Sequence, residues 1–264
     1  MQTDMLGMTA VVHGGTKGIG RASVRKLAES GANVVIQGTD EKAARSLIDE
    51  CGGYGGERLF VTSDLLTYEG VEIPVALAKE RFGRVDVIIS SGGPRLPGPK
   101  LFVDMTPEES LEGMRVRLVP RLYALHAAVK YMRDQNYGKV VLVTTDAARI
   151  PTPSESMIGA AGAATMFLTQ SLAMELARHG IRVNSVATTL TTDTPRYDTY
   201  LDAIGRGSNE VIVKAFTKAE QKVAFRLNTA ADLAEYILFL SSRESDQISG
   251  STMSINGGLS FPRY

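Results

Sequence analysis

Short apolar runs alternate along the chain with longer segments of helical periodicity. The apolar runs are residues 9–13, 33–37, 58–62, 85–90, 139–144, 182–187 and 250–255. The helical patterns are residues 21–30, 41–51, 70–82, 107–136, 155–179 and 230–241. Strands that are apolar throughout, separated by helices of this length, are typical of a parallel sheet covered on both faces. The pattern predicts one α/β domain, spanning residues 1–264, with about seven strands.

Residues 188–222 are the least regular stretch, rich in threonine and charge, and they follow a predicted strand. Long segments at the carboxyl edge of an α/β sheet are commonly lids or binding loops. We expect a substrate-binding loop or lid here, the alternative being a surface excursion without function. Tyr197 and Tyr200 are expected at its surface, with proton donation to a substrate as the alternative.

A glycine-rich turn joins the first predicted strand to the first predicted helix. Glycines let backbone N–H groups approach a pyrophosphate, and a helix N-terminus adds partial positive charge. The strand–turn–helix context predicts a nucleotide site, the alternative being a structural turn. His13, just before the turn, is expected to be structural rather than a phosphate contact. The residues of the turn are Gly14, Thr16, Lys17, Gly18, Ile19 and Gly20.

Together with later segments, this turn resembles the short-chain dehydrogenase/reductase family over nearly the whole chain. The other matching segments are residues 64–65, 90–93, 172–176, 180–184, 238–241 and 248–258. The resemblance implies a doubly wound, Rossmann-type fold with a small-molecule substrate. It adds Asp64, Leu65, Ser91 and Gly92 to the dinucleotide site. It also implies a homodimer or homotetramer that associates through the helices after the fourth and fifth strands.

The end of the second predicted strand bears on the choice of dinucleotide. An NAD-type site needs an acid there to hold the ribose 2′-hydroxyl, but Gly38 stands at the position where the family has that acid. Lys17 and the Thr39 hydroxyl can contact a 2′-phosphate, although many NADP-binding relatives have arginine in place of Thr39. Asp40 is expected to cap the next helix. We therefore expect NADP(H) rather than NAD(H).

The resemblance also locates the family's usual catalytic residues, and the main pair is absent. Counting back from Glu175, Ile158 stands at the tyrosine position and Gly162 at the lysine position. In the family this tyrosine transfers the proton and the lysine lowers its pKa. We therefore expect no carbonyl reduction by the usual route, and we expect Gly162 to leave a hole.

Three polar residues remain as catalytic candidates. Thr145 keeps a hydroxyl at the family's serine position and can stabilise an oxyanion. Arg117, near the family's relay asparagine, can bind a carboxylate or phosphate, or else lies at the surface or a subunit interface. Asp146 can act as an acid or base, or else is a cap or turn residue.

Composition narrows the classes of function. Lys and Arg total 29 and so do Asp and Glu, so a nucleic-acid binder is not expected. A single cysteine, Cys51, excludes an internal disulfide and any cysteine-based zinc site, and we expect no metal. No apolar run reaches ~18 residues, and the N-terminus lacks a signal-peptide pattern. These features predict a cytoplasmic protein without membrane association.

The function favoured by these features is an atypical NADP(H)-dependent oxidoreductase that acts on a small carbonyl or conjugated enone. Hydride addition to an enone leaves an enolate, which needs oxyanion stabilisation more than a positioned acid. One alternative is a nucleotide-binding pseudoenzyme or regulatory protein without turnover. Another is a non-redox isomerase or dehydratase.

Overall fold

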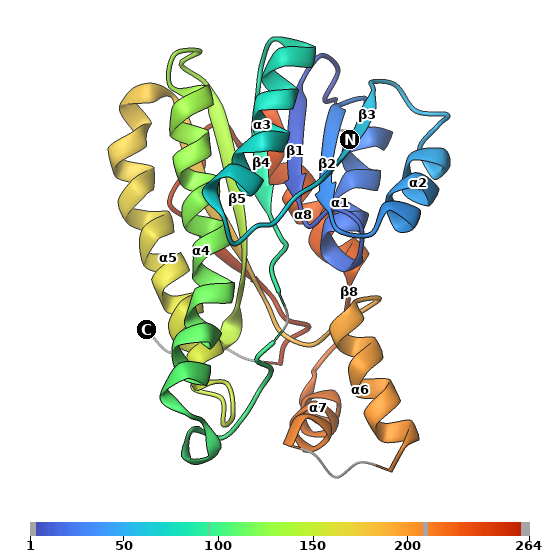
Figure 1. Ribbon diagram of the computed structural model, residues 1–264, viewed down its shortest axis with the longest axis vertical. Coiled ribbons are helices and arrows are strands. Elements are labelled where there is room, and N and C mark those ends of the chain that lie inside the picture. Colours follow the sequence, from blue (N-terminus) through green and yellow to red (C-terminus); the bar gives the residue numbers. More distant parts are fainter. Residues whose placement is uncertain (1–3, 95, 208–210, 260–264) are drawn as a thin grey trace.

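A parallel sheet of seven strands forms the centre of the computed structural model, which describes residues 4–94, 96–207 and 211–259. The strand order is β3-β2-β1-β4-β5-β6-β9, which confirms the predicted fold (Figure 1). The order reverses between β1 and β4, so loops diverge there and leave a crevice for ligands at the carboxyl ends of the strands. The strands are β1 (Thr9–His13), β2 (Asn33–Gly38), β3 (Arg58–Thr62), β4 (Val87–Ser90), β5 (Gly138–Thr145), β6 (Ile181–Thr188) and β9 (Thr252–Ile255).

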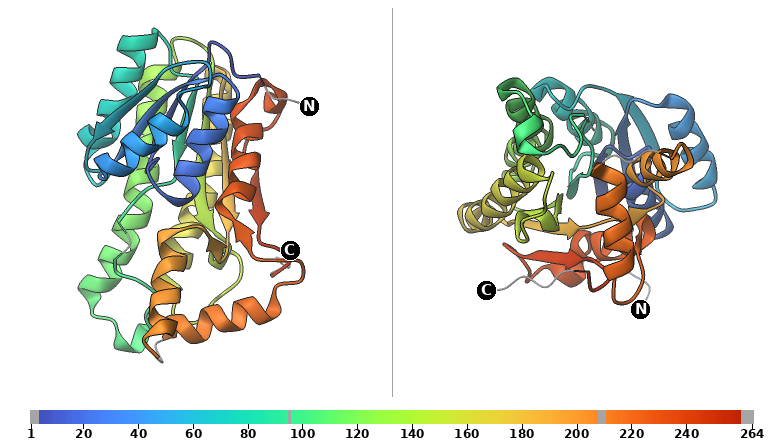
Figure 2. Two further views of the ribbon diagram at one scale, coloured as in Figure 1. Left: turned by 90° about the vertical axis from the view of Figure 1, so that its right-hand side faces the viewer. Right: turned by 90° about the horizontal axis from the view of Figure 1, so that it is seen from below.

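Helices cover both faces of the sheet, as two separate apolar clusters show. One face packs against α1 (Gly18–Glu29), α2 (Glu41–Glu50) and α8 (Ala230–Ser241). The other packs against α3 (Tyr68–Phe82), α4 (Pro107–Met132) and α5 (Ser156–Leu176), and Figure 2 shows the layers from two further sides. Short 3-10 turns are η1 (Phe102–Asp104), η2 (Asp146–Ala148), η3 (Ala177–His179) and η4 (Arg243–Ser245).

The stretch expected to be irregular contains two helices. Within residues 188–222, β7 (Thr191–Thr192) is followed by α6 (Pro195–Gly205) and α7 (Val211–Lys222). Leu190, Tyr200 and Phe216 form a small apolar core of their own. Tyr200 is only 1% exposed, so the expected surface position is wrong for this residue.

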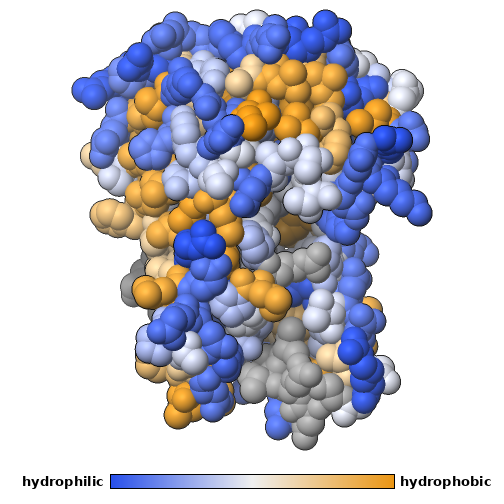
Figure 3. All heavy atoms as spheres, in the orientation of Figure 1, coloured by the Kyte–Doolittle hydropathy of each residue, from blue (hydrophilic) through white to orange (hydrophobic). Residues whose placement is uncertain are grey.

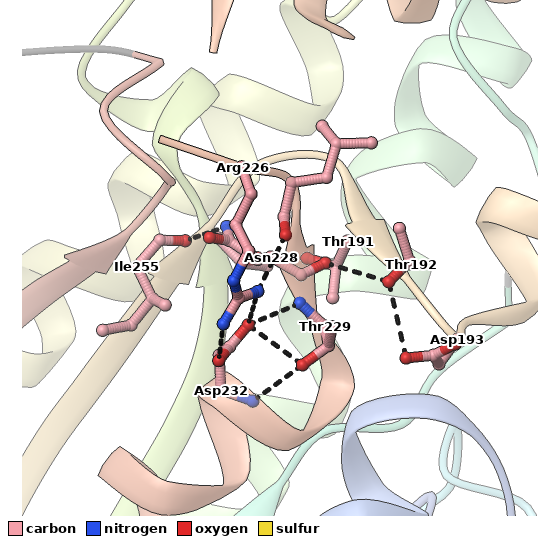
Figure 4. A network of polar contacts seen from close by, with 10 residues as sticks. Thr191, Thr192, Asp193, Arg226, Asn228, Thr229, Asp232 and Ile255 are labelled. Carbon is pink, nitrogen blue, oxygen red and sulfur yellow. Dashed lines mark hydrogen bonds and ion pairs between the residues drawn. The ribbon is translucent and has the colours of Figure 1, made fainter. Parts of the chain in front are cut away.

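Polar contacts attach the α6–α7 segment to the body of the protein (Figure 4). β7 pairs in parallel with β8 (Asn228–Thr229). The Asn228 amide donates to the backbone oxygen of Ile255 at the end of β9, and Arg226 forms an ion pair of 2.6 Å with Asp232. Asp232 also completes the cap of α8 with Thr229. The two ends of the segment, at β7 and β8, are therefore paired with each other and hydrogen-bonded to the end of β9 at the edge of the sheet.

The surface over α4 and α5 carries exposed apolar side chains, which include Phe167 and Met174 on α5. In Figure 3, hydrophobic and hydrophilic residues are interspersed on the side of the molecule where these helices lie. The described helix Ser156–His179 is long and apolar enough to span a membrane by those two criteria alone. It packs against α4, β5 and β6, as a helix that covers an α/β sheet does.

Candidate functional site

The glycine turn brings the ends of β1 and β4 into direct contact. A Cβ atom on Gly14 would lie 2.3 Å from the Cα of Gly92, and one on Gly20 would lie 2.1 Å from the oxygen of Gly14. Gly14 also has a φ of +75°, a conformation that side chains disfavour. The glycines are therefore required for the closeness of the turn to α1 and to the β4 loop.

The N-terminus of α1 opens onto a cavity of about 950 Å³. Side chains of Asp40, Thr67, Thr106 and Thr229 cap the helices that follow them, whereas no side chain caps α1 in the described part of the chain. Its first N–H groups thus remain available to an anion. Of the predicted dinucleotide residues, the cavity is lined by Gly14, Thr16, Lys17, Gly18, Ile19, Thr39, Asp64, Leu65, Ser91 and Gly92.

The end of β2 has no room for the acid of an NAD-type site. A Cβ on Gly38 would lie 2.5 Å from the methyl carbon of Thr16. Next to it, the Lys17 ammonium forms an ion pair of 2.6 Å with Asp40. The hydrogen bond from Lys17 holds the pKa of the Asp40 carboxyl below its usual value. Asp40 also accepts from the Ala43 N–H, which confirms its predicted role as a helix cap.

His13 lies at the end of β1 and is completely buried. Its Nε2 donates to the backbone oxygen of Val71 at 2.9 Å, so the ring ties β1 to α3. Burial lowers the pKa of His13 to about 4. A neutral ring in this position holds structure and does not line the cavity beside the glycine turn.

A second cavity, of about 770 Å³, includes the two positions where the sequence predicts that the family's catalytic pair is replaced. Thr145, Asp146, Ile158 and Gly162 line it, and so does Arg117. Ile19, Arg117, Thr194 and Arg196 line both cavities. The predicted nucleotide site and the predicted catalytic residues therefore adjoin, with the start of α6 at their boundary.

Gly162 does not leave a hole, in contrast to the expectation. A Cβ on it would lie 2.7 Å from the Thr145 methyl carbon and 2.9 Å from the Cβ of Ala148. One turn earlier, a Cβ on Gly159 would lie 2.6 Å from the backbone oxygen of Ala147. Both glycines let α5 pack directly on η2, and neighbours occupy the space where a lysine side chain would begin.

The two candidates at the end of β5 are held by different contacts. Both oxygens of the Asp146 carboxylate accept hydrogen bonds, at 2.6 Å from the Ser254 hydroxyl and 2.8 Å from the Asn256 amide. Asp146 thus links β5 to the residues around β9. The Thr145 hydroxyl accepts from the Ala147 N–H at 3.1 Å, which leaves its own proton free to donate.

Arg117 and Arg121 are both oriented by backbone carbonyls. Arg117 donates to Gly113 and Pro97, and Arg121 donates to Gly92 and Val143. Burial is the main cause that lowers the pKa of Arg117 to about 10, and repulsion from Arg196 is the second cause. For Arg121, too, burial is the main cause that lowers the pKa to about 10, and repulsion from Arg117 is the second cause.

Arg121 was missed by the sequence analysis, although it also lines the second cavity. Its spacing of four residues from Arg117 puts both side chains on one face of α4. That spacing was the available signal, but it does not by itself distinguish a cavity from a solvent-exposed surface.

Comparison with known proteins identifies the family. A family model described as enoyl-(acyl carrier protein) reductase matches residues 14–260. This chain belongs to the short-chain dehydrogenase/reductase family. Proteins of this family are oxidoreductases that use NAD(H) or NADP(H).

Several curated relatives match this short-chain dehydrogenase/reductase over almost their whole length. L-rhamnose 1-dehydrogenase (NAD(P)(+)) of Azotobacter vinelandii is 31% identical, with 97% of each chain covered. 1,6-dihydroxycyclohexa-2,4-diene-1-carboxylate dehydrogenase of Acinetobacter baylyi is 30% identical over 94% of each chain. 3-oxoacyl-(acyl-carrier-protein) reductase FabG of Haemophilus influenzae is 29% identical over 97% of this chain and 99% of its own.

Proposed function

We propose that this chain is an NADP(H)-dependent oxidoreductase that reduces a small carbonyl or a conjugated enone without the tyrosine–lysine pair. The observation that carries the proposal is the junction of the two cavities. Their shared lining at Ile19 and Arg117 joins the cavity beside the glycine turn to the cavity that contains Thr145 and Gly162. A dinucleotide in the first cavity would thus be next to a substrate in the second.

The residues present suit an enone better than an isolated ketone. When bound, the dinucleotide supplies a hydride, which adds to the β-carbon of an enone while the carbonyl oxygen gains the negative charge. The Thr145 hydroxyl and the Arg117 guanidinium are the donors that we assign to that oxygen. Water then protonates the α-carbon, so no tyrosine is needed to complete the reduction. Asp146 is assigned a structural role because both its oxygens already accept hydrogen bonds.

The site fits a dinucleotide with a 2′-phosphate. The uncapped start of α1 and the glycine turn can hold the pyrophosphate. Gly38 carries no acid that would repel a 2′-phosphate, and Lys17 is the cation that the glycine turn contributes to the lining of this cavity. Asp40 opposes this preference through its ion pair with Lys17. We propose NADP(H) on balance, with Lys17 shared between Asp40 and the phosphate.

The α6–α7 segment is proposed to be a lid over the second cavity. Leu190, Thr194 and Arg196 from its first part and Phe216 from α7 line that cavity. Tyr197 and Tyr200 both donate to Glu220, at 3.0 and 2.9 Å, and so hold α6 against α7. Burial raises the pKa of both phenols, which argues for this bracing role over proton donation.

We also propose a cytoplasmic homodimer or homotetramer. Phe167 and Met174 are 69% and 83% exposed on α5, the helix after the fifth sheet strand in sequence. Apolar side chains exposed together on one helix are better explained by a second copy of the chain than by permanent contact with water.

The experiment is nucleotide binding followed by a turnover screen. NADPH and NADH are titrated separately by fluorescence, and the loss of reduced nucleotide is then followed with panels of ketones and enones. We expect the protein to bind NADPH more tightly than NADH and to oxidise NADPH when an enone is present. Binding without oxidation across the panels supports the pseudoenzyme, and failure to bind either nucleotide contradicts the oxidoreductase. Rapid turnover of simple ketones contradicts a site that works without the tyrosine–lysine pair.

A further inference from the structure

Basic side chains outnumber carboxylates in the described lining of the second cavity. Six basic side chains and two carboxylates line it among the described residues. Of the two carboxylates, Asp146 is bound by Ser254 and Asn256, and Glu155 is paired with Arg196 at 2.9 Å. Neither carboxylate is within ion-pair distance of Arg117 or Arg121. Glu155 offsets part of the Arg117 charge from a distance, but no carboxylate in the described part of the chain forms an ion pair with either guanidinium group.

Three arginines form a chain of neighbouring charges. Burial is the main cause that lowers the pKa of Arg117 and of Arg121, and repulsion between Arg196 and Arg117 and between Arg117 and Arg121 lowers these pKa values further. Backbone carbonyls orient Arg117 and Arg121 but do not neutralise them. A charge cluster that is partly removed from water is costly unless a counter-charge completes it. An anion in the cavity relieves this repulsion.

The arginines also have donors left for a ligand. A guanidinium has five N–H donors in a planar fork. The bonds to Gly113 and Pro97 use two donors of Arg117, and those to Gly92 and Val143 use three of Arg121. Arg196, held from one side by Glu155, stacks over the Phe216 ring at 5.4 Å. Guanidinium forks match the geometry of carboxylate and phosphate oxygens.

Apolar side chains also line the cavity, among several threonines and lysines. Val143 comes from β5 and Ile158 from α5, and Leu190 and Phe216 come from residues 188–222. A ligand that fills the cavity therefore needs an apolar body as well as its charge.

We propose that the second cavity selects a small molecule with an apolar body and one oxyanion group, a carboxylate or a phosphate, held by Arg117, Arg121 and Arg196. That this molecule is the substrate rests on the proposed function, whereas its binding does not. Arg121 and Arg196 are specificity residues that place the apolar body beside Thr145 and Ile158, and Arg117 holds the oxyanion group with donors that it does not use for the carbonyl oxygen.

The test measures binding without turnover. Cyclohexanecarboxylate, cyclohexyl phosphate and the uncharged cyclohexanecarboxamide are titrated calorimetrically into the full-length protein, with and without NADPH. We expect at least one oxyanion to bind about tenfold more tightly than the amide, as one charge-assisted contact provides. The tighter of the two oxyanions tells whether the site prefers carboxylate or phosphate.

Variants assign that preference to the arginines. Arg117→Gln is expected to reduce oxyanion affinity to that of the amide, and Arg117→Lys to retain part of the difference. The matched control is Arg115→Gln, because Arg115 lies on the same helix but pairs with Glu112 at the surface. If Arg117→Gln does not fold, Arg196→Gln removes a charge from the other wall and is expected to weaken the oxyanion in the same way.

Three results overturn the inference: equal binding of the amide and the oxyanions, no saturable binding of either oxyanion, or an Arg117→Gln protein that loses NADPH affinity but keeps oxyanion affinity. The last result assigns the guanidinium to the dinucleotide. Oxyanion binding without any hydride transfer retains the anion site and rejects the proposed function, so the two failures are distinguishable.

Discussion

Lys17 and Asp40 form an ion pair at the end of β2, where we expect the protein to distinguish NADP(H) from NAD(H). Because Asp40 both pairs with Lys17 and carries a negative charge, it should weaken binding of a 2′-phosphate. Asp40→Asn keeps the helix cap but removes the charge, and we expect it to raise NADPH affinity about three- to tenfold with little change for NADH. Lys17→Ala should do the opposite for NADPH. Fluorescence titrations with both nucleotides measure this, and equal changes for the two would contradict the assignment of Lys17.

His13 should make the stability of the protein depend on pH. The unfolded ring takes up a proton as pH falls below 6.5, whereas the buried ring does so only near pH 4. The unfolding free energy is thus highest above pH 6.5 and is expected to fall by roughly 3 kcal/mol as the pH is lowered to 4. His13→Gln can still donate to Val71 and should lose this part of the slope. Urea unfolding at several pH values compares the two proteins, and identical slopes would show that another group titrates.

At the scale of elements, the contact between α5 and η2 is expected to leave no space for a side chain at position 162. Gly162→Ala would place its Cβ 2.7 Å from Thr145, so we expect a loss of about 1–3 kcal/mol of stability. The matched control is Gly205→Ala in α6, whose Cβ would meet nothing within 4 Å and which should gain up to ~1 kcal/mol. Thermal unfolding of both variants measures the difference. A stable Gly162→Ala would contradict the close packing.

The same contact predicts the outcome of rebuilding the family's catalytic pair. Ile158→Tyr combined with Gly162→Lys restores the family's residue types but pushes α5 from η2, so it should be destabilised and should not gain ketone reduction. Ile158→Tyr alone is the control, because it changes no glycine. Ketone turnover by a stable double variant would show that the backbone at Gly162 can accommodate the lysine.

Local pattern was enough to predict the sheet and the place of the glycine turn between β1 and α1. β1 and β3 run over the predicted residues because each is a short apolar run bounded by polar residues. Residues 188–222 were different, since α6 and α7 are stabilised by the contacts of Tyr200 with Phe216 and Glu220, which connect distant positions in the sequence. The filled space at Gly162 and the charge cluster around Arg121 depend likewise on which elements come together, and residue spacing alone does not contain that information.

At the scale of the whole molecule, the exposed apolar face of α5 should control association. Phe167→Asp combined with Met174→Glu places two charges on that face, and we expect a shift from oligomer to monomer with unchanged folding. Leu6→Asp is the control. Leu6 is also exposed, but it lies next to Gly31 in the loop before β2 and is not part of the α5 face. Light scattering coupled to size-exclusion chromatography measures the mass. A wild-type monomer, or an oligomer unchanged by the two charges, would contradict the proposed interface.

Hydride transfer is the step on which the whole account depends, and isotope transfer tests it most directly. The protein is incubated with enones and NADPH that carries deuterium at the transferable position, and the products are analysed by mass spectrometry. We expect a saturated carbonyl product with deuterium on the β-carbon and a solvent proton on the α-carbon, formed by the wild-type protein with Ile158 and Gly162 in place. Tight NADPH binding without deuterium in the product of any carbonyl or enone substrate would contradict hydride transfer by this protein.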